Sequence, residues 1–203
     1  MKKTSKGKAG YYAYEKKKRF LIMALMFAIP ITIYVTGLIM HHTRNNILTV
    51  VAVLGVIPAA RFAVSWIMVF LEKSVPEDIV QITEKNAPDL IRGYELCVTA
   101  YEGRMPLDAV VVCGNSVACY SSRGNKEKFS FMEQHMAKIL SSNDIYGVKV
   151  KIFSEKKAYA DRIRSLNDNP QPSRDNLKYR VNEQYPDLSG DELIWETLKS
   201  IAI

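Results

Sequence analysis

Cysteine and histidine are the side chains best suited to metal binding or redox chemistry in this sequence. The chain has three of each, namely Cys97, Cys113, Cys119, His41, His42 and His135. No two cysteines stand in Cys-x-x-Cys spacing, and the histidines are divided between an N-terminal pair and one distant residue. We therefore expect no metal site and no cofactor. The cysteines are expected to be buried apolar residues.

A predicted β-hairpin also separates two of the thiols. Residues 107–113 and 116–122 are rich in strand-forming residues and are joined by Gly114-Asn115, a combination typical of a two-residue hairpin turn. With this turn, Val110 pairs with Cys119 and Cys113 pairs with Ser116, so the two thiols lie on opposite faces and should not form a disulfide. The sequence contains no glycine-rich phosphate loop, Gly-x-Ser-x-Gly or His-Glu-x-x-His motif. A triad assembled from distant residues stays open.

The positive charge is concentrated at the N-terminus. The chain has 28 basic and 21 acidic residues, for a net charge of +7. Residues 1–19 hold eight of the basic residues and one acidic residue, Glu15, whereas the other 184 residues are balanced. The excess charge therefore describes a basic tail, and we do not expect nucleic acid as a partner.

Two long apolar runs follow the tail. Residues 20–40 contain no charged residue, and as a helix they would span roughly 32 Å, close to the bilayer core of about 30 Å. Residues 47–71 contain one charge, Arg61. A buried hairpin in a soluble core would need more protein to cover it than the remaining residues supply. A cleaved signal peptide is disfavoured because the first run exceeds the usual length of about 7–15 residues and no small-residue cleavage site follows. We expect a transmembrane hairpin over residues 20–71.

The basic tail also predicts the orientation of this hairpin. Loops rich in lysine and arginine stay in the cytoplasm, so both termini are expected there and residues 41–46 outside. The expected location is the plasma membrane, crossed twice. The residues nearest the first apolar run should contact anionic lipid headgroups, and these are Lys16, Lys17, Lys18 and Arg19.

Arg61 breaks the apolar pattern of the second run. It lies ten residues before Leu71, roughly 15 Å along a straight helix. An arginine at such depth costs about 2.5–3.5 kcal/mol on insertion scales and commonly pairs, faces a polar cavity or snorkels. The first run offers no carboxylate. We hypothesise that Arg61 contacts a partner helix or an anionic lipid group, with snorkelling to the headgroups as the alternative.

The rest of the chain predicts an α+β protein. Residues 74–168 are expected to form a mixed cytoplasmic domain with the order α-β-β-β-α-β, and residues 173–203 a C-terminal helical segment. The expected strands cover residues 94–101, 107–113, 116–122 and 146–153. One expected helix starts near residue 77, and the others cover residues 130–140, 155–166, 175–185 and 189–201. Two of these helices begin with capping-box spacings, Ser130–Glu133 and Ser189–Glu192.

The element order over residues 77–153 resembles the core of the PD-(D/E)xK nuclease-like fold, including its nuclease-related (NERD-like) domains. The resemblance rests on this order and on Gly93-Tyr-Glu95 and Leu107-Asp-Ala-Val-Val111, where such families carry an acid ahead of an apolar strand. It implies that acids hold Mg²⁺ and that a lysine supports the attacking water. Where a Glu-x-Lys motif should follow, this sequence has Cys119 and Ser121, which implies a non-catalytic version.

Two functions from different classes follow. The first is a membrane-anchored interaction or scaffolding module at the inner face, which binds a protein partner or a second copy through the hairpin or the C-terminal helix. The second is a membrane-tethered, metal-dependent hydrolase, whose site would be built from Glu95 and Asp108 with Lys149 or Lys151. The absence of a complete catalytic motif favours the first.

Overall fold

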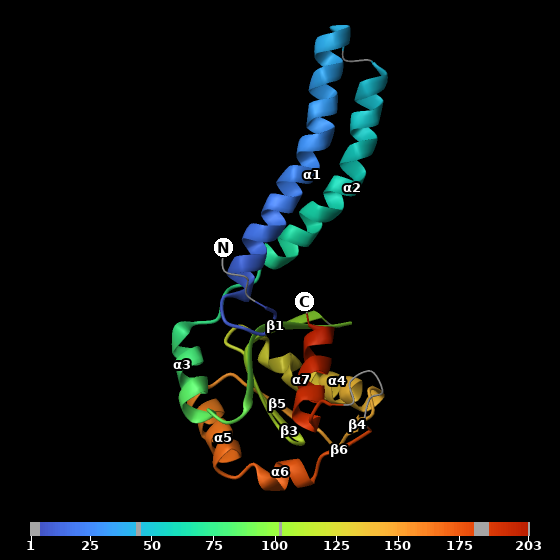
Figure 1. The fold of residues 1–203 in the computed structure, drawn as a ribbon. Coiled ribbons are helices and arrows are strands. Elements are labelled where there is room, and N and C mark those ends of the chain that lie inside the picture. Colours follow the sequence, from blue (N-terminus) through green and yellow to red (C-terminus); the bar gives the residue numbers. More distant parts are fainter. Residues whose placement is uncertain (1–4, 44–45, 102, 181–186, 203) are drawn as a thin grey trace. The chain divides into compact units, whose positions relative to one another are not determined.

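The computed structural model describes residues 5–43, 46–101, 103–180 and 187–202, drawn in colour in Figure 1. The chain divides into two compact units. One comprises residues 12–73, and the other comprises residues 5–11 together with residues 74–202. The second unit therefore contains a short part of the expected N-terminal tail, and it also contains the C-terminal segment.

The first unit consists of two long apolar helices, α1 (Tyr11–His41) and α2 (Ile47–Phe70). Both are long and apolar enough to cross a membrane. α1 begins nine residues before the expected apolar run, and its charged first part contains ion pairs from Glu15 to Lys18 and Arg19 at spacings that stabilise a helix. The two helices approach closely at glycines. A Cβ on Gly55 would lie 3.3 Å from Pro30, and one on Gly37 would lie 2.7 Å from Leu48.

The second unit is built on a mixed sheet of four strands, which confirms the expected α+β class. The strands are β1 (Ile91–Ala100), β2 (Gly103–Cys113), β3 (Ser116–Tyr120) and β5 (Lys149–Phe153), in the spatial order β1-β2-β3-β5. The first three are antiparallel neighbours, and β5 is parallel to β3. The crossover between β3 and β5 contains a short 3₁₀ helix, η1 (Lys126–Lys128), and the helix α4 (Phe129–Ser142).

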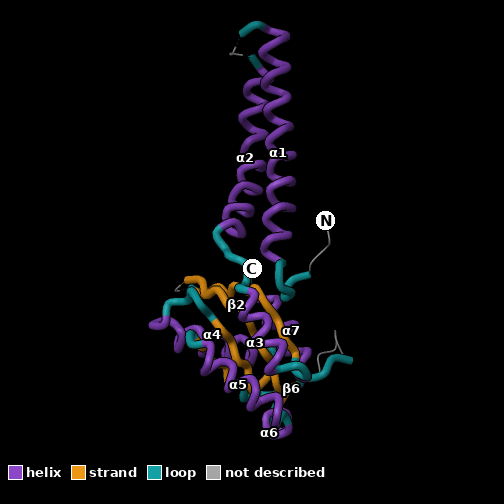
Figure 2. Tube along the Cα trace, turned by 90° about the vertical axis from the view of Figure 1, so that its left-hand side faces the viewer, coloured by secondary structure: helices purple, strands orange, loops and turns teal. Residues whose placement is uncertain are grey.

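Helices cover both faces of this sheet. α3 (Glu77–Asn86) and α5 (Lys156–Asp168) pack on one face around Ile79, Tyr159 and Ile163. α4 and the last helix, α7 (Gly190–Ile201), pack on the other around Met136 and Ile194. Figure 1 shows the sheet between these two layers, and Figure 2 views the same unit with α3 and α5 toward the reader.

The predicted β-hairpin is confirmed in its register. Val112 pairs with Val117, Val110 with Cys119, and Cys113 with Ser116. Gly114 adopts a φ of 51°, which the tight turn requires and which glycine tolerates best. Cys119 packs on the α4 side of the sheet and Cys113 on the α5 side. All three cysteines are buried.

Three expected elements were wrong in detail. The strand expected over residues 146–153 is divided at Gly147, where φ is 74°, into β4 (Ile145–Tyr146) and β5. The short helix α6 (Gln171–Asp175) and the strand β6 (Lys178–Tyr179), which pairs with β4, replace the first part of the helix expected at 175–185. Residues 181–185 of that expectation lie outside the described residues. α4 has no capping box, because it starts at Phe129 and Glu133 instead accepts a hydrogen bond from the backbone of Ile152.

Candidate functional site

Glu95 is a buried carboxylate in the middle of β1, with an exposed fraction of 1%. Its backbone has a φ of 55°, a left-handed conformation that is uncommon for residues other than glycine. The regular pairing of β1 with β2 is interrupted there, between the pairs Tyr94–Ala109 and Leu96–Leu107. A non-glycine residue in this conformation inside a strand marks a local irregularity that the surrounding structure must hold in place.

The side chain of Glu95 joins two segments that are far apart in the sequence. Its Oε1 atom accepts hydrogen bonds from the backbone N–H groups of Gly10 and Val75, each at 3.0 Å. Gly10 immediately precedes α1, and Val75 follows α2 by five residues. One carboxylate oxygen therefore binds the segment that enters the helical hairpin and the segment that leaves it. Bonds from N–H donors to a charged acceptor are among the stronger hydrogen bonds in proteins.

Asp108, the second expected acid, stabilises the loop after β3. It has an exposed fraction of 2%, and its Oδ2 atom accepts hydrogen bonds from the backbone nitrogen and the hydroxyl of Ser122, both at 2.6 Å. The guanidinium of Arg123 lies 3.5 Å from its other oxygen. The carboxylate thus binds two consecutive residues of this loop, Ser122 and Arg123.

The alternation of side chains also changes between Leu107 and Val110. Both residues pack on the α4 side of the sheet, although an odd and an even position in a regular strand face opposite sides. Leu96 packs on the same side and Tyr94 on the other, so β1 carries the matching change at Glu95. The face of Asp108 cannot therefore be assigned by counting alternate residues from the hairpin turn.

The two candidate lysines lie on β5 and are exposed. Lys151 forms an ion pair with Glu133 of α4, with Nζ and Oε1 3.2 Å apart. Glu95 and Asp108 stand opposite each other in the register of β1 and β2, but their hydrogen bonds and the ion pair of Lys151 go to three different parts of the second unit. Among the residues that the structure describes, no three histidine, cysteine, aspartate or glutamate side chains are grouped as a metal site would require.

The N-terminal segment docks on β1, a feature that sequence reasoning missed. The carbonyl of Gly7 accepts a hydrogen bond from the backbone of Tyr94 at 2.9 Å, and Lys6 donates to the carbonyl of Ala202 at 2.5 Å. Ala202 itself forms a β-bridge with Val98. The segments around Gly7 and Ala202 thus cover the outer edge of β1, which would otherwise present unpaired backbone groups. The only signals in the sequence are two glycines, Gly7 and Gly10, within the basic tail.

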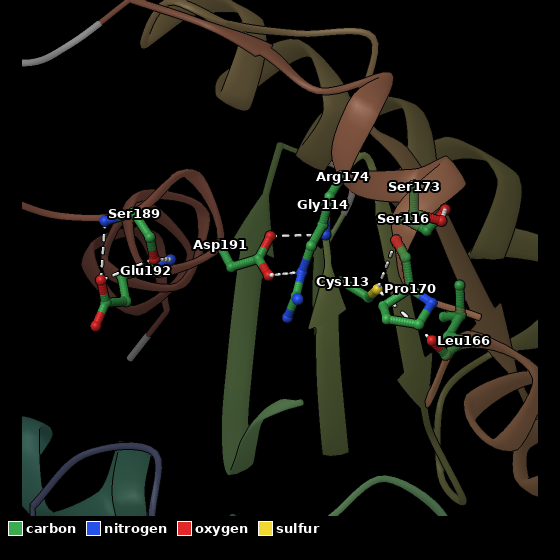
Figure 3. A network of polar contacts seen from close by, with 10 residues as sticks. All are labelled: Cys113, Gly114, Ser116, Leu166, Pro170, Ser173, Arg174, Ser189, Asp191 and Glu192. Atoms are coloured by element: carbon green, nitrogen blue, oxygen red, sulfur yellow. Dashed lines mark hydrogen bonds and ion pairs between the residues drawn. The ribbon is translucent and has the colours of Figure 1, made fainter. Parts of the chain in front are cut away.

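A second polar network, shown in Figure 3, fixes the hairpin turn between β2 and β3. The carboxylate of Asp191 accepts a hydrogen bond from the backbone of Gly114 at 2.7 Å and pairs with Arg174 at 3.3 Å. The backbone of Asn115 donates to the carbonyl of Ser173 at 2.8 Å. Asp191 lies in the first turn of α7, whose capping box between Ser189 and Glu192 is confirmed. The sequence predicted this helix start and this turn separately, but not their contact.

Cys113 borders the same network. Its thiol lies 3.8 Å from the carbonyl oxygens of Leu166 and Pro170. Burial raises the pKa of this thiol, and the nearby charge of Asp191 raises it further. A thiol with a raised pKa is a poor nucleophile, and this cysteine packs in the core between the sheet and α5.

In the helical unit, the basic residues of α1 lie alongside the end of α2. Arg19 donates to the hydroxyl and the carbonyl of Ser65 at 3.1 and 3.2 Å. The rings of Phe20 and Trp66 are 5.7 Å apart, and Lys16 lies 5.7 Å from the centre of the Phe70 ring. Arg61, by contrast, is exposed and forms no hydrogen bond or ion pair with the residues that the structure describes.

Compared with known proteins, the chain matches no family model, no curated protein and no solved structure. The resemblance to nuclease-like domains therefore stays a prediction from element order and two short motifs.

Proposed function

We propose that this chain is a two-pass membrane protein that anchors an α+β interaction or scaffolding module at the inner face of the plasma membrane. The observation that carries the proposal is the exposure of the two long apolar helices. In the most apolar stretch of each helix, only 11% of the residues are buried. The core helix of a soluble protein is mostly buried, whereas a lipid-facing helix keeps its apolar side chains on the outside.

The pairing of α1 with α2 supports membrane insertion on independent grounds. The contacts of Arg19 with Ser65 and of Phe20 with Trp66 align the basic end of α1 with residues 65–70 of α2. The part of α2 beyond this level, residues 47–65, is roughly 28 Å long, close to the thickness of a bilayer core. Aromatic and basic residues therefore gather at one end of an apolar segment of the right length, which is the pattern of a membrane interface.

The orientation follows from the same basic residues. Lys16, Lys17, Lys18 and Arg19 stand at one end of the hairpin, and the connection between the helices contains one arginine. Basic residues favour the cytoplasmic side, so the module of residues 74–202 and both chain ends belong in the cytoplasm.

A binding role is favoured over catalysis by the way the acidic residues are used. Glu95 and Asp108 both accept backbone hydrogen bonds that hold the fold together. Within the described part of the chain, no contact favours the metal-dependent hydrolase, which stays a prediction. The apolar face of α7 is occupied within its own unit, since Leu193, Ile194 and Leu198 are buried against the sheet. The exposed helical hairpin is therefore the better surface for a protein partner or a second copy.

The experiment that tests the topology is cysteine labelling in intact cells. Thr43→Cys places an exposed thiol in the connection between α1 and α2, and Lys17→Cys places one in the basic segment. A membrane-impermeant maleimide should label the first variant in intact cells and the second only after permeabilisation. The unchanged chain is the background control, because its own cysteines are buried. Labelling of Lys17→Cys in intact cells would contradict the proposed orientation.

A further inference from the structure

Arg61 is the one charged residue of the second apolar run, residues 47–71, and it has no hydrogen bond or ion pair with the residues that the structure describes. Together with Ile57, Pro58, Phe62 and Ser65, it lines a groove of about 690 Å³ on α2. These five residues recur at the spacing of one helix face. An exposed arginine in this setting needs a partner, because an uncompensated charge inside a bilayer core is costly.

The contacts of Arg19 fix how deep Arg61 lies. Ser65, which accepts hydrogen bonds from Arg19, is level with the basic end of α1. Arg61 stands four residues farther along α2, roughly 6 Å deeper. This depth is much smaller than the 15 Å expected from the end of the apolar run, because residues 65–70 lie beside the charged part of α1. A long arginine side chain can bridge one helical turn and bring its guanidinium to the headgroup level.

The partner of Arg61 cannot come from this hairpin. Residues 20–71 contain no aspartate and no glutamate. A second copy of the chain would bring another arginine, and the acid of its α1, Glu15, is already paired with Lys18 and Arg19. The complementary group must therefore be an anion supplied from outside the chain.

The polarity of the groove matches a phospholipid. Ile57 and Pro58 form its deep end, whereas Arg61 and Ser65 lie toward the basic interface. A phospholipid has the same order of groups, with acyl chains inside the bilayer and a phosphate at its surface. Guanidinium groups bind phosphate strongly because their donors match two of its oxygens.

We propose that this groove, which we name the Arg61 groove, binds one acidic phospholipid, with Arg61 on its phosphate and an acyl chain along Ile57 and Pro58. This inference rests on the proposed membrane insertion and deepens it by naming a lipid class. One basic residue contributes roughly 1 kcal/mol to binding of anionic lipid near a surface, which corresponds to a preference of about fivefold.

The test measures which lipid surrounds α2. Trp66 contacts Phe20 and Phe70 one turn from the Arg61 groove, and Trp195→Phe leaves it as the only tryptophan. The full chain is reconstituted into vesicles of phosphatidylcholine and phosphatidylglycerol at a fixed ratio. Bromine atoms are placed on the acyl chains of one lipid or of the other. Brominated phosphatidylglycerol should quench Trp66 more strongly than brominated phosphatidylcholine. The relative affinity calculated from the two quenching values should favour phosphatidylglycerol about fivefold.

Matched variants separate the Arg61 groove from general charge attraction. Arg61→Leu should lower the preference close to one, and Arg61→Lys should retain most of it. Lys157→Leu removes an exposed basic residue of α5, outside the helical unit, and should leave the preference intact. If Trp195→Phe disturbs the second unit, native mass spectrometry of the otherwise unchanged chain and of Arg61→Leu counts bound phosphatidylglycerol instead.

Three results would overturn the lipid site. One is equal quenching by both brominated lipids in the parent chain. The second is a preference that survives Arg61→Leu, which would assign it to the basic segment. The third is an Arg61-dependent crosslink to another membrane protein, found together with no lipid preference. It would assign the partner of Arg61 to a carboxylate of that protein instead of a lipid. A chain that does not float with the vesicles would instead refute membrane insertion itself, so the two failures are distinguishable.

Discussion

The Oε1 atom of Glu95 lies 3.0 Å from the backbone nitrogen of Gly10, eighty-five positions earlier in the chain. The same oxygen accepts the N–H of Val75. The residue before the first long helix and the segment after the second are thus fixed to one point of the sheet. Any change in the spacing of these two segments must break or move a hydrogen bond to this carboxylate.

Replacing Glu95 should destabilise the second unit. Glu95→Ala removes the acceptor of two charge-assisted hydrogen bonds in a buried site, and we expect a loss of about 2–4 kcal/mol in the free energy of unfolding. Glu95→Gln keeps an oxygen acceptor and should lose only about 1 kcal/mol. Denaturant unfolding of the full chain in detergent, followed through Trp195, measures both values. Trp195 is a suitable reporter because its ring packs against Gly7 and Gly93.

A control substitution at an exposed glutamate and a measurement at single amides make the prediction for Glu95 specific. Glu84 is exposed on α3, so Glu84→Ala should leave the unfolding free energy nearly unchanged. Hydrogen exchange at the amides of Gly10 and Val75 should accelerate in Glu95→Ala before global unfolding. Unchanged exchange at these two amides would show that Glu95 does not hold them.

Two glycines with positive φ should respond differently to alanine. A Cβ on Gly114 would lie 2.2 Å from the backbone carbonyl of Ser173, whereas one on Gly147 would meet no atom within 4 Å. Gly147→Ala should therefore cost only the conformational penalty of about 1–2 kcal/mol. Gly114→Ala adds a collision with the backbone, which costs about 1–3 kcal/mol more. Equal unfolding free energies for the two variants would contradict the close approach of α6 to this turn.

Local patterns explain why much of the fold could be predicted. The Gly114-Asn115 turn, the strand register around it and the capping box of α7 each depend on residues close together in the sequence. These features were confirmed. The two apolar helices were predicted for the same reason, since length and composition suffice.

The contacts that join distant segments could not be predicted in this way. No local pattern indicates that Gly7 pairs with Tyr94, or that Glu95 adopts a left-handed conformation and reverses the alternation of β1. Because of the same irregularity, the face of Asp108 cannot be found by counting alternate residues from the hairpin turn. The position of Arg61 relative to the basic end of α1 could not be predicted either, because it depends on how the two helices are aligned, as the contact of Arg19 with Ser65 shows.

The native thiols should be unreactive. All three cysteines are buried, and burial raises the pKa values of Cys113 and Cys119, so little reactive thiolate forms at neutral pH. Titration with an aromatic disulfide reagent should detect essentially no thiol in the folded chain and three after denaturation. Rapid reaction of one thiol in the native chain would indicate an exposed or activated cysteine.

The ion pair between Asp78 and Lys156 should give a small, pH-dependent contribution to stability. The hydrogen bond from Lys156 lowers the pKa of Asp78 below its usual 3.8, and the same contact raises the pKa of Lys156 above its usual 10.5. The contribution is therefore complete between these two values. It is lost as the pH falls through the lowered pKa of Asp78 or rises through the raised pKa of Lys156.

Asp78→Asn measures this contribution. The melting temperature of the variant should lie slightly below that of the parent chain at neutral pH, and the difference should vanish in strong acid and at high salt, because both groups are exposed. A difference that persists well below pH 3.8 would assign the effect to something other than charge.

Protease protection of a C-terminal tag tests the central claim most directly, because it reports insertion and orientation together. In sealed inside-out membrane vesicles the tag should be digested, and in intact cells it should be protected. Protection in the vesicles with digestion in cells would invert the proposed orientation. Recovery of the tagged chain in the soluble fraction would contradict membrane anchoring altogether.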